Sequence, residues 1–319
     1  MNKPFRVMIN SSGYHLRSLI GMKMLKDHGF ELTTNPYGRI YHDDELRAAA
    51  AGYDAVIADT ETWDEASFAA AKDLKCLIRF GTGMNSVDLE AAKRHGVLVA
   101  NTPGYNANAV SEQTVALFLN MARYIPQYDV DLREGKWSRY LTSEIAGKRL
   151  AILGFGAIGQ KSAVKLSGFD LDIVAYDKFP NEEASKRTGV KFVDFDTAIS
   201  TSDFIFIHLP LLPETENLIC TKTISKMKDG VMIVNSARGP IVNEEETAAA
   251  LLSGKIAAMA SDVFVVEPLS ENPLSKCPNF IASPHIAGET YENMEATGIA
   301  AAQAVIDFYE GREPSHCFV

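Results

Sequence analysis

The segment RLAILGFGAIGQ, residues 149–160, restricts the possible folds of this chain more than any other. An apolar, strand-like run passes there into Gly-x-Gly-x-x-Gly, and a helix-forming stretch follows. In such a motif Gly154 allows the tight turn, Gly156 lets a phosphate approach the backbone, and Gly159 lets the helix pack closely on the strand. Free N–H groups at a helix N-terminus bind anions. The segment therefore predicts a strand–turn–helix unit that binds the pyrophosphate of a dinucleotide.

A second apolar run, residues 172–176, ends at Asp177, 18 residues beyond Gly159. A carboxylate at this spacing accepts hydrogen bonds from the adenosine ribose of a bound dinucleotide. It would also repel a 2′-phosphate, and only Lys178 nearby could offset that repulsion. We therefore predict NAD rather than NADP as the cofactor. The alternative is a glycine-rich turn with an incidental aspartate.

Short β-branched runs alternate with amphipathic stretches along the whole chain. Several runs, such as CLIRF and FIFIHLP, are apolar on both faces, which is typical of parallel strands covered by helices on each side. This alternation predicts a doubly wound α/β fold. The expected strands are residues 5–10, 55–58, 77–80, 97–100, 149–153, 172–176, 204–208, 231–235 and 258–262. The expected helices include residues 16–28, 43–50, 64–72, 87–94, 109–134, 244–252 and 291–310.

Composition narrows the class of protein. With 31 Lys and Arg against 41 Asp and Glu, the net charge of −10 argues against non-specific binding to nucleic acid or to an anionic membrane. No apolar run approaches the ~18 residues that cross a bilayer, and the start, MNKPFRVMIN, predicts no secretory signal. The four cysteines lack metal-ligand spacing, so we expect free thiols in the cytoplasm and no metal site.

Three polar residues follow the later strands, where open α/β sheets place their ligands. Arg238 comes after strand 231–235, Glu267 comes after strand 258–262, and His285 lies in the segment SPHIAG. Singly, they could be a surface turn residue, a solvated charge and an ordinary loop histidine. Together they combine a guanidinium for a carboxylate, an imidazole for proton transfer, and a carboxylate that keeps the imidazole basic.

Six segments in order resemble the D-isomer-specific 2-hydroxyacid dehydrogenase family, near its phosphoglycerate dehydrogenase and hydroxypyruvate reductase branches. They are RFGTGMNSVDLEAAKRHGVLVANTPG at 79–104, LAILGFGAIGQ at 150–160, HLPLLPETENLI at 208–219, NSARGPIVNEEE at 235–246, SDVFVVEPL at 261–269 and SPHIAG at 283–288. The resemblance implies two doubly wound parallel-sheet domains: a flavodoxin-like substrate domain, 1–103 plus 284–319, and an inserted Rossmann NAD-binding domain, 104–283. It also implies an active site in the cleft between them and a homodimer with residues 110–140 at the interface.

The resemblance further implies an NAD-dependent oxidoreductase that transfers a hydride between the nicotinamide and C2 of a 2-keto or D-2-hydroxy acid. His285 would protonate the keto oxygen, Glu267 would keep His285 protonated until transfer, and Arg238 would hold the substrate carboxylate. The expected substrate residues are Arg79, Gly81, Thr82, Gly83, Met84, Arg238 and His285. The expected cofactor residues are Gly154, Phe155, Gly156, Ala157, Ile158, Gly159, Asp177, Leu209, Pro210, Thr215, Ser236, Ala237, Arg238, Asp262, His285 and Gly288.

The segment ADTET, residues 58–62, bears on the substrate. Phosphoglycerate-type members of the family usually carry an arginine at the start of this loop, whereas Asp59 and Glu61 stand here. A phosphorylated substrate would meet like charge, at a cost of about 1 kcal/mol, and no regulatory domain is expected after the last helix. We therefore expect a small unphosphorylated acid such as hydroxypyruvate or glyoxylate, with a branched or aromatic 2-keto acid left open. The alternatives are D-3-phosphoglycerate dehydrogenase and an NAD(H)-sensing protein similar to transcriptional corepressors.

Overall fold

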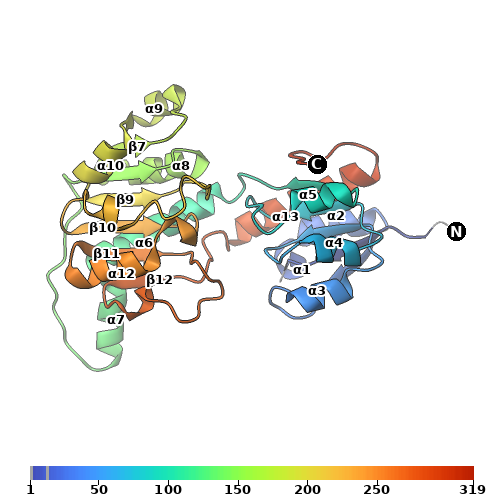
Figure 1. Ribbon diagram of the computed structural model, residues 1–319, viewed down its shortest axis with the longest axis horizontal. Helices are drawn as coiled ribbons and strands as arrows, with labels where there is room; N and C mark the ends of the chain where they lie inside the picture. Colours follow the sequence, from blue (N-terminus) through green and yellow to red (C-terminus); the bar gives the residue numbers. More distant parts are fainter. Residues whose placement is uncertain (1–2, 12–13) are drawn as a thin grey trace. The chain divides into compact units, whose positions relative to one another are not determined.

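The computed structural model describes residues 3–11 and 14–319. The chain divides into two compact units, Met1–Asn106 with Glu289–Val319, and Ala107–Gly288. These limits lie within five residues of the domain boundaries expected from the sequence. Each unit contains one sheet in which all paired strands run parallel (Figure 1). The structure thus confirms two doubly wound α/β units.

The first unit has five strands in the order β2-β1-β3-β4-β5. Successive side chains of a strand point to opposite faces of the sheet, and here both faces are buried. One face packs on α1, α2 and α13, and the other packs on α3, α4 and α5. The strands are β1 (Arg6–Ile9), β2 (Glu31–Thr34), β3 (Ala55–Ala58), β4 (Cys76–Arg79) and β5 (Leu98–Asn101). The helices are α1 (Tyr14–Arg17), α2 (Leu19–Asp27), α3 (Asp43–Ala49), α4 (Glu65–Ala70), α5 (Leu89–Arg94) and α13 (Tyr291–Tyr309).

The second unit has seven strands in the order β12-β11-β10-β9-β6-β7-β8. The chain builds outward from β6 in both directions, so the topological switch point, where such sheets bind ligands, lies between β6 and β9. The strands are β6 (Arg149–Leu153), β7 (Asp172–Tyr176), β8 (Lys191–Phe192), β9 (Phe204–Ile207), β10 (Val231–Asn235), β11 (Ile256–Ser261) and β12 (Phe280–Ala282).

Helices cover both faces of this second sheet. Helices α6 (Ala107–Arg123), α8 (Ala157–Leu166) and α9 (Glu182–Thr188) cover one face. Helices α10 (Phe195–Thr201), α11 (Thr221–Ile224) and α12 (Glu244–Ser253) cover the other. Two short 3-10 helices, η1 (Gly239–Ile241) and η2 (Leu274–Lys276), follow later strands. Within residues 3–11 and 14–319, no helix is both long and apolar enough to span a membrane.

The single helix expected over 109–134 is two helices, so that prediction was wrong. Helix α6 ends at Arg123, and α7 covers Ile125–Arg133. Tyr124 between them has a left-handed backbone, with φ of 55°. Pro126 lies at the start of α7; it lacks an N–H, and its ring disfavours a continuous helix through the preceding turn. The proline therefore explains the break.

Candidate functional site

The glycines of the Gly154–Gly159 loop are required by close contacts. Gly154 has φ of 95°, and a Cβ there would lie 2.7 Å from the carbonyl carbon of His208. A Cβ on Gly159 would lie 2.3 Å from the carbonyl oxygen of Gly154. The first turn of α8 can therefore pack against the loop only if residue 159 is glycine. A Cβ on Gly156 would meet open space. The N-terminus of α8 is therefore open at Gly156, as the binding of a pyrophosphate requires.

Asp177 follows β7 and is hydrogen-bonded to this loop. Its Oδ2 accepts the backbone N–H of Phe155 at 2.8 Å, and its Oδ1 accepts that of Phe179 at 2.9 Å. A carboxylate has about four acceptor positions, so this one can still accept hydrogen bonds from a ribose. The ammonium group of Lys178 pairs with Glu214 at 2.8 Å. Lys178, the neighbouring cation that could offset the charge of Asp177, is therefore engaged elsewhere.

Glu267 and His285 form an ion pair in the second unit. Oε2 of Glu267 lies 2.6 Å from Nδ1 of His285, and Oε1 accepts the N–H of Phe264 at 2.8 Å. Burial raises the pKa of Glu267, but the hydrogen bond and charge of His285, the N–H of Phe264 and the charge of Arg238 together hold it below its usual value. The side chain of His285 is 43% exposed. Its other ring nitrogen can therefore meet a ligand while Glu267 fixes the ring.

The segment that carries Arg238 packs against the segment that leads to Glu267. A Cβ on Gly239 would lie 1.9 Å from the carbonyl carbon of Phe264, so the two backbones approach as closely as glycine allows. Asn235, at the end of β10, braces the turn by accepting the N–H of Ala237 and donating to the carbonyl of Arg238. Burial lowers the pKa of Arg238, and the nearby Glu267 carboxylate opposes that shift. Arginine side chains stay protonated in proteins, and Nη1 of this guanidinium donates to the carbonyl of Ala237 at 2.6 Å.

Asp262, expected at the nicotinamide end of the cofactor, is buried and holds the His285 segment. Its Oδ1 accepts the hydroxyl of Ser283 and the N–H of Ile286 at 3.0 Å, and its Oδ2 accepts the N–H of Ala287 at 2.9 Å. His285 has a left-handed backbone, with φ of 54°, which is uncommon outside glycine. The three hydrogen bonds to Asp262 stabilise that conformation and direct the imidazole.

The remaining predicted cofactor residues lie after β9 and β10. Thr215 closes its loop by donating to the carbonyl of Pro210 at 2.7 Å and accepting the N–H of Leu212. The hydroxyl of Ser236 lies 2.7 Å from that of Thr114 on α6. Leu209 and Ala237 are buried beside them. These segments are at the carboxyl edge of the sheet, on the β9 and β10 side of the switch point.

His208 belongs to the same edge and was missed by the sequence reasoning. Its ring nitrogens lie 3.3 Å from the hydroxyls of Ser162 on α8 and of Ser236. Burial lowers the pKa of His208 to about 3, so the imidazole is neutral. The available signal was its position directly after the apolar run FIFI, where a strand delivers a side chain to the ligand edge. His208 links α8 to the segment that leads to Arg238.

In the first unit, several expected substrate residues have structural contacts. Arg79 is buried and donates to the carbonyl of Phe80. The N–H of Gly81 donates to the hydroxyl of Thr102 at 2.7 Å, so it is already engaged. Binding of the substrate carboxylate by the N–H groups of Thr82, Gly83 and Met84 stays a prediction.

From the sequence, a substrate is expected to meet the charges of both Asp59 and Glu61, but Glu61 is buried. It accepts hydrogen bonds from the side chains of Asn10 at 2.7 Å and Trp63 at 3.1 Å, and from the N–H of Asp59 at 3.0 Å. Burial raises the pKa of Glu61. It anchors the loop after β3, so any repulsion of a phosphate from this loop rests on the more exposed Asp59.

The chain is similar to known proteins in sequence and in fold. The model of the D-isomer specific 2-hydroxyacid dehydrogenase NAD binding domain matches residues 115–287, so the predicted cofactor is the one that the family model names. D-3-phosphoglycerate dehydrogenase of Archaeoglobus fulgidus is 39% identical over 84% of this chain and 52% of its own length. The chain spans about half the length of several such relatives.

Two further relatives are matched over most of their own length. Hydroxypyruvate reductase of Thermotoga maritima is 40% identical over 74% of this chain and 78% of its own. The crystal structure of a glyoxylate reductase from Paecilomyes thermophila superposes with a TM-score of 0.85 at 26% identity, covering 99% of this chain and 98% of that one. From the matched domain, these identities and the shared fold, we conclude that the chain belongs to the D-isomer specific 2-hydroxyacid dehydrogenase family.

Proposed function

We propose that this protein is an NAD-dependent dehydrogenase that transfers a hydride between the nicotinamide and C2 of a small 2-keto or D-2-hydroxy acid. The observation that carries the proposal is the arrangement of Arg238, Glu267 and His285, in which Glu267 contacts the exposed imidazole of His285 and also lies close enough to the Arg238 guanidinium to raise its pKa. NAD, when bound, supplies the hydride donor or acceptor. Gly156, at the open N-terminus of α8, and Asp177 are the residues proposed to hold it.

Each residue of the set has a distinct task. Arg238 binds the carboxylate of the 2-keto acid and polarises its keto group, which favours negative charge on the oxygen. Because Nδ1 of His285 faces Glu267, the proton to be transferred is carried on Nε2. During reduction C2 gains the hydride and the keto oxygen gains this proton, which yields the 2-hydroxy acid. The ionised Glu267 stabilises the imidazolium before transfer and orients the ring throughout.

We propose an unphosphorylated substrate of the hydroxypyruvate or glyoxylate type. Asp59 follows β3 at the carboxyl edge of the first sheet, and a terminal phosphate near it would meet like charge. The similarity to a hydroxypyruvate reductase and to a glyoxylate reductase supports this choice. The similarity to D-3-phosphoglycerate dehydrogenases supports the alternative substrate, 3-phosphoglycerate.

The deciding experiment is NADH oxidation at 340 nm by the purified chain. The panel is glyoxylate, hydroxypyruvate, pyruvate, 2-ketoisocaproate, phenylpyruvate and 3-phosphohydroxypyruvate. We expect the highest kcat/KM with glyoxylate or hydroxypyruvate. Preference for the phosphorylated acid would replace this substrate by that of a phosphoglycerate dehydrogenase. NADH binding without turnover of any acid would overturn the dehydrogenase and favour an NAD(H) sensor.

We also propose that two copies associate through α7 and the segment after it. Trp137 is 84% exposed and Leu141 is fully exposed, and Leu132 on α7 is also exposed. Large exposed apolar side chains this close in sequence are candidates for an interaction surface. Light scattering after size exclusion should give a dimer for the native chain and a monomer for the Trp137→Ser, Leu141→Ser double variant. A native monomer would refute the proposal. The four free thiols suit a cytoplasmic location.

A further inference from the structure

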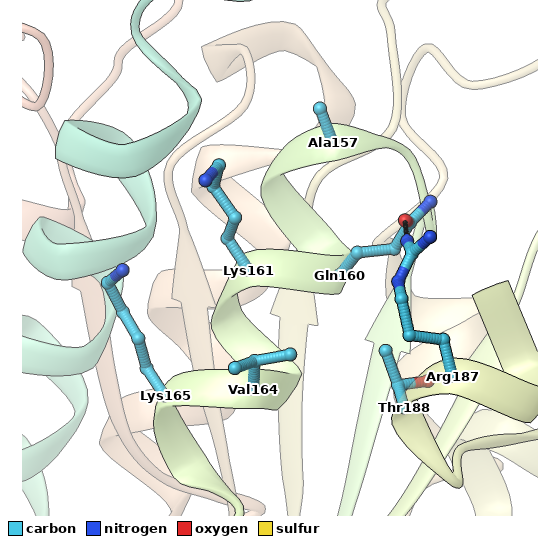
Figure 2. A pocket seen from close by; sticks show the side chains of 7 residues that line it. All are labelled: Ala157, Gln160, Lys161, Val164, Lys165, Arg187 and Thr188. Carbon is cyan, nitrogen blue, oxygen red and sulfur yellow. Dashed lines mark hydrogen bonds between the residues drawn. The ribbon is translucent and has the colours of Figure 1, made fainter.

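A cavity of about 370 Å³ lies along the outward face of α8, next to the glycine loop (Figure 2). Its position matters because it begins at Ala157, the first residue of α8, and continues down the helix toward α9. Three of the seven residues that line it are basic. The lining residues are Ala157, Gln160, Lys161, Val164, Lys165, Arg187 and Thr188.

Two of the three basic side chains are already engaged. The ammonium group of Lys165 donates to Oδ1 of Asn108 at 2.8 Å and lies 3.5 Å from a carboxylate oxygen of Glu112, both on α6. The guanidinium of Arg187 donates to the amide oxygen of Gln160. Lys161 is exposed, and within residues 3–11 and 14–319 its ammonium group has no hydrogen-bond or ion-pair partner. It is thus the basic group of this cavity that can bind a ligand at no cost to an existing contact.

Lys161 also lies where an anion at the head of α8 can be reached. It follows Ala157 by four residues, so both side chains share one face of the helix, and helical side chains lean toward the N-terminus. Figure 2 shows the Lys161 side chain extending from the ribbon toward the end that carries Ala157, whereas Lys165 points toward α6. The helix N-terminus offers only about half a positive charge, and the methyl group of Ala157 adds none. A pyrophosphate bound there would carry two negative charges.

We propose that Lys161 is the cation that binds the pyrophosphate of the dinucleotide at the N-terminus of α8. This inference rests on the cofactor assigned in the proposed function. Lys161 contributes positive charge and takes no part in hydride or proton transfer. It should therefore strengthen the binding of NAD and of NADH equally. It makes no contribution to the binding of the adenosine portion, whose ribose Asp177 is proposed to bind.

The test measures binding by the full chain. NADH fluorescence titrations give Kd for the native protein and for Lys161→Ala, Lys161→Arg and Lys165→Ala, and displacement of NADH by ADP and by adenosine gives their affinities. Lys161→Ala should weaken NADH and ADP about fivefold, as expected for one partly solvated contact to phosphate, and leave adenosine unchanged. Lys161→Arg should restore most of the affinity. Lys165→Ala, in the same cavity one turn further on, should bind like the native chain.

Three results would overturn the role of Lys161: unchanged NADH binding by Lys161→Ala, equal weakening of adenosine and ADP, or the same loss in Lys165→Ala. If the native protein and Lys161→Ala bind NADH equally well, the role of Lys161 is rejected and the proposed function is not affected. Lys161-dependent binding without turnover of any 2-keto acid would reject the dehydrogenase and retain Lys161. Native protein that binds no NADH would reject both.

Discussion

Glu267 contacts His285 through one carboxylate oxygen, Oε2, at 2.6 Å from Nδ1, and uses the other to accept the N–H of Phe264 within its own loop. The carboxylate is thus fixed from two sides before it meets the imidazole. Although burial raises the pKa of Glu267, its partners hold that pKa below the usual value. Glu267 therefore stays ionised in the range where the enzyme would work, and a change at either residue should affect chemistry more than cofactor binding.

Replacement of His285 by alanine removes the proposed proton donor and leaves the glycine loop and Asp177 intact. We expect kcat for the preferred 2-keto acid to fall by a factor of about 100 or more. The Kd for NADH, measured by fluorescence, should change less than threefold. Native-like turnover by His285→Ala would remove this residue from the mechanism.

Glu267→Gln keeps the size of the side chain and removes its charge. The amide can still accept the N–H of Phe264, so the fold of the loop should survive, but an imidazolium at His285 loses its ionised partner. The kcat/KM of this variant for reduction should therefore be about tenfold below that of the native chain at pH 7.5. Part of the loss should be recovered at pH 6, because the higher proton concentration favours the imidazolium. A pH profile parallel to that of the native enzyme would show that the Glu267 charge has no part in proton transfer.

Asp177→Asn should reduce discrimination between NADH and NADPH, because it removes the charge that repels a 2′-phosphate. The asparagine oxygen can still accept one of the two backbone N–H groups, from Phe155 or Phe179. We expect the ratio of kcat/KM for NADPH over NADH to rise about tenfold. Lys178→Ala is the matched neighbour, and it should leave the ratio unchanged since Lys178 pairs with Glu214. An unchanged ratio in Asp177→Asn would show that Asp177 does not contact the ribose of the cofactor.

Local rules were enough to predict the glycine loop and the candidate residues Arg238 and Glu267, because each follows a predicted apolar strand whose end sets its position, whereas His285 was found through its segment SPHIAG. The same rules missed β2, β8 and β12, which are short and only partly buried. They also assigned Glu61 the wrong environment. Its buried carboxylate accepts hydrogen bonds from Asn10 and Trp63, and Asn10 follows the end of another strand, β1. No window of sequence around residue 61 contains that contact.

His208 makes stability depend on pH. Burial lowers its pKa to about 3, against about 6.5 in an unfolded chain. Between these values the unfolded chain binds a proton at this histidine and the folded chain does not. The contribution of neutral His208 to the free energy of unfolding is therefore fully present above about pH 6.5 and is lost as the pH drops toward about 3. The loss cannot exceed about 1.4 kcal/mol per pH unit, and the partial exposure of the residue as a whole makes it smaller. Urea unfolding of His208→Gln should show about 1 kcal/mol less loss between pH 7 and 5 than the native chain; equal losses would contradict the assignment.

Gly239→Ala tests whether the backbone contact beside Arg238 sets the geometry of the site. The added Cβ would lie 1.9 Å from the carbonyl carbon of Phe264 and 2.4 Å from the nitrogen of Val265, so one of the two segments must move. Overpacking of this kind costs about 1–3 kcal/mol, which corresponds to a fall in Tm of roughly 3–10 °C for a unit of this size. Because Phe264 holds Glu267, the shift should also separate Arg238 from the ion pair and lower kcat/KM more than it weakens NADH binding. Gly168→Ala is the control, since a Cβ at Gly168 meets open space. If both variants melt and turn over alike, the close approach of these two segments does not position the site.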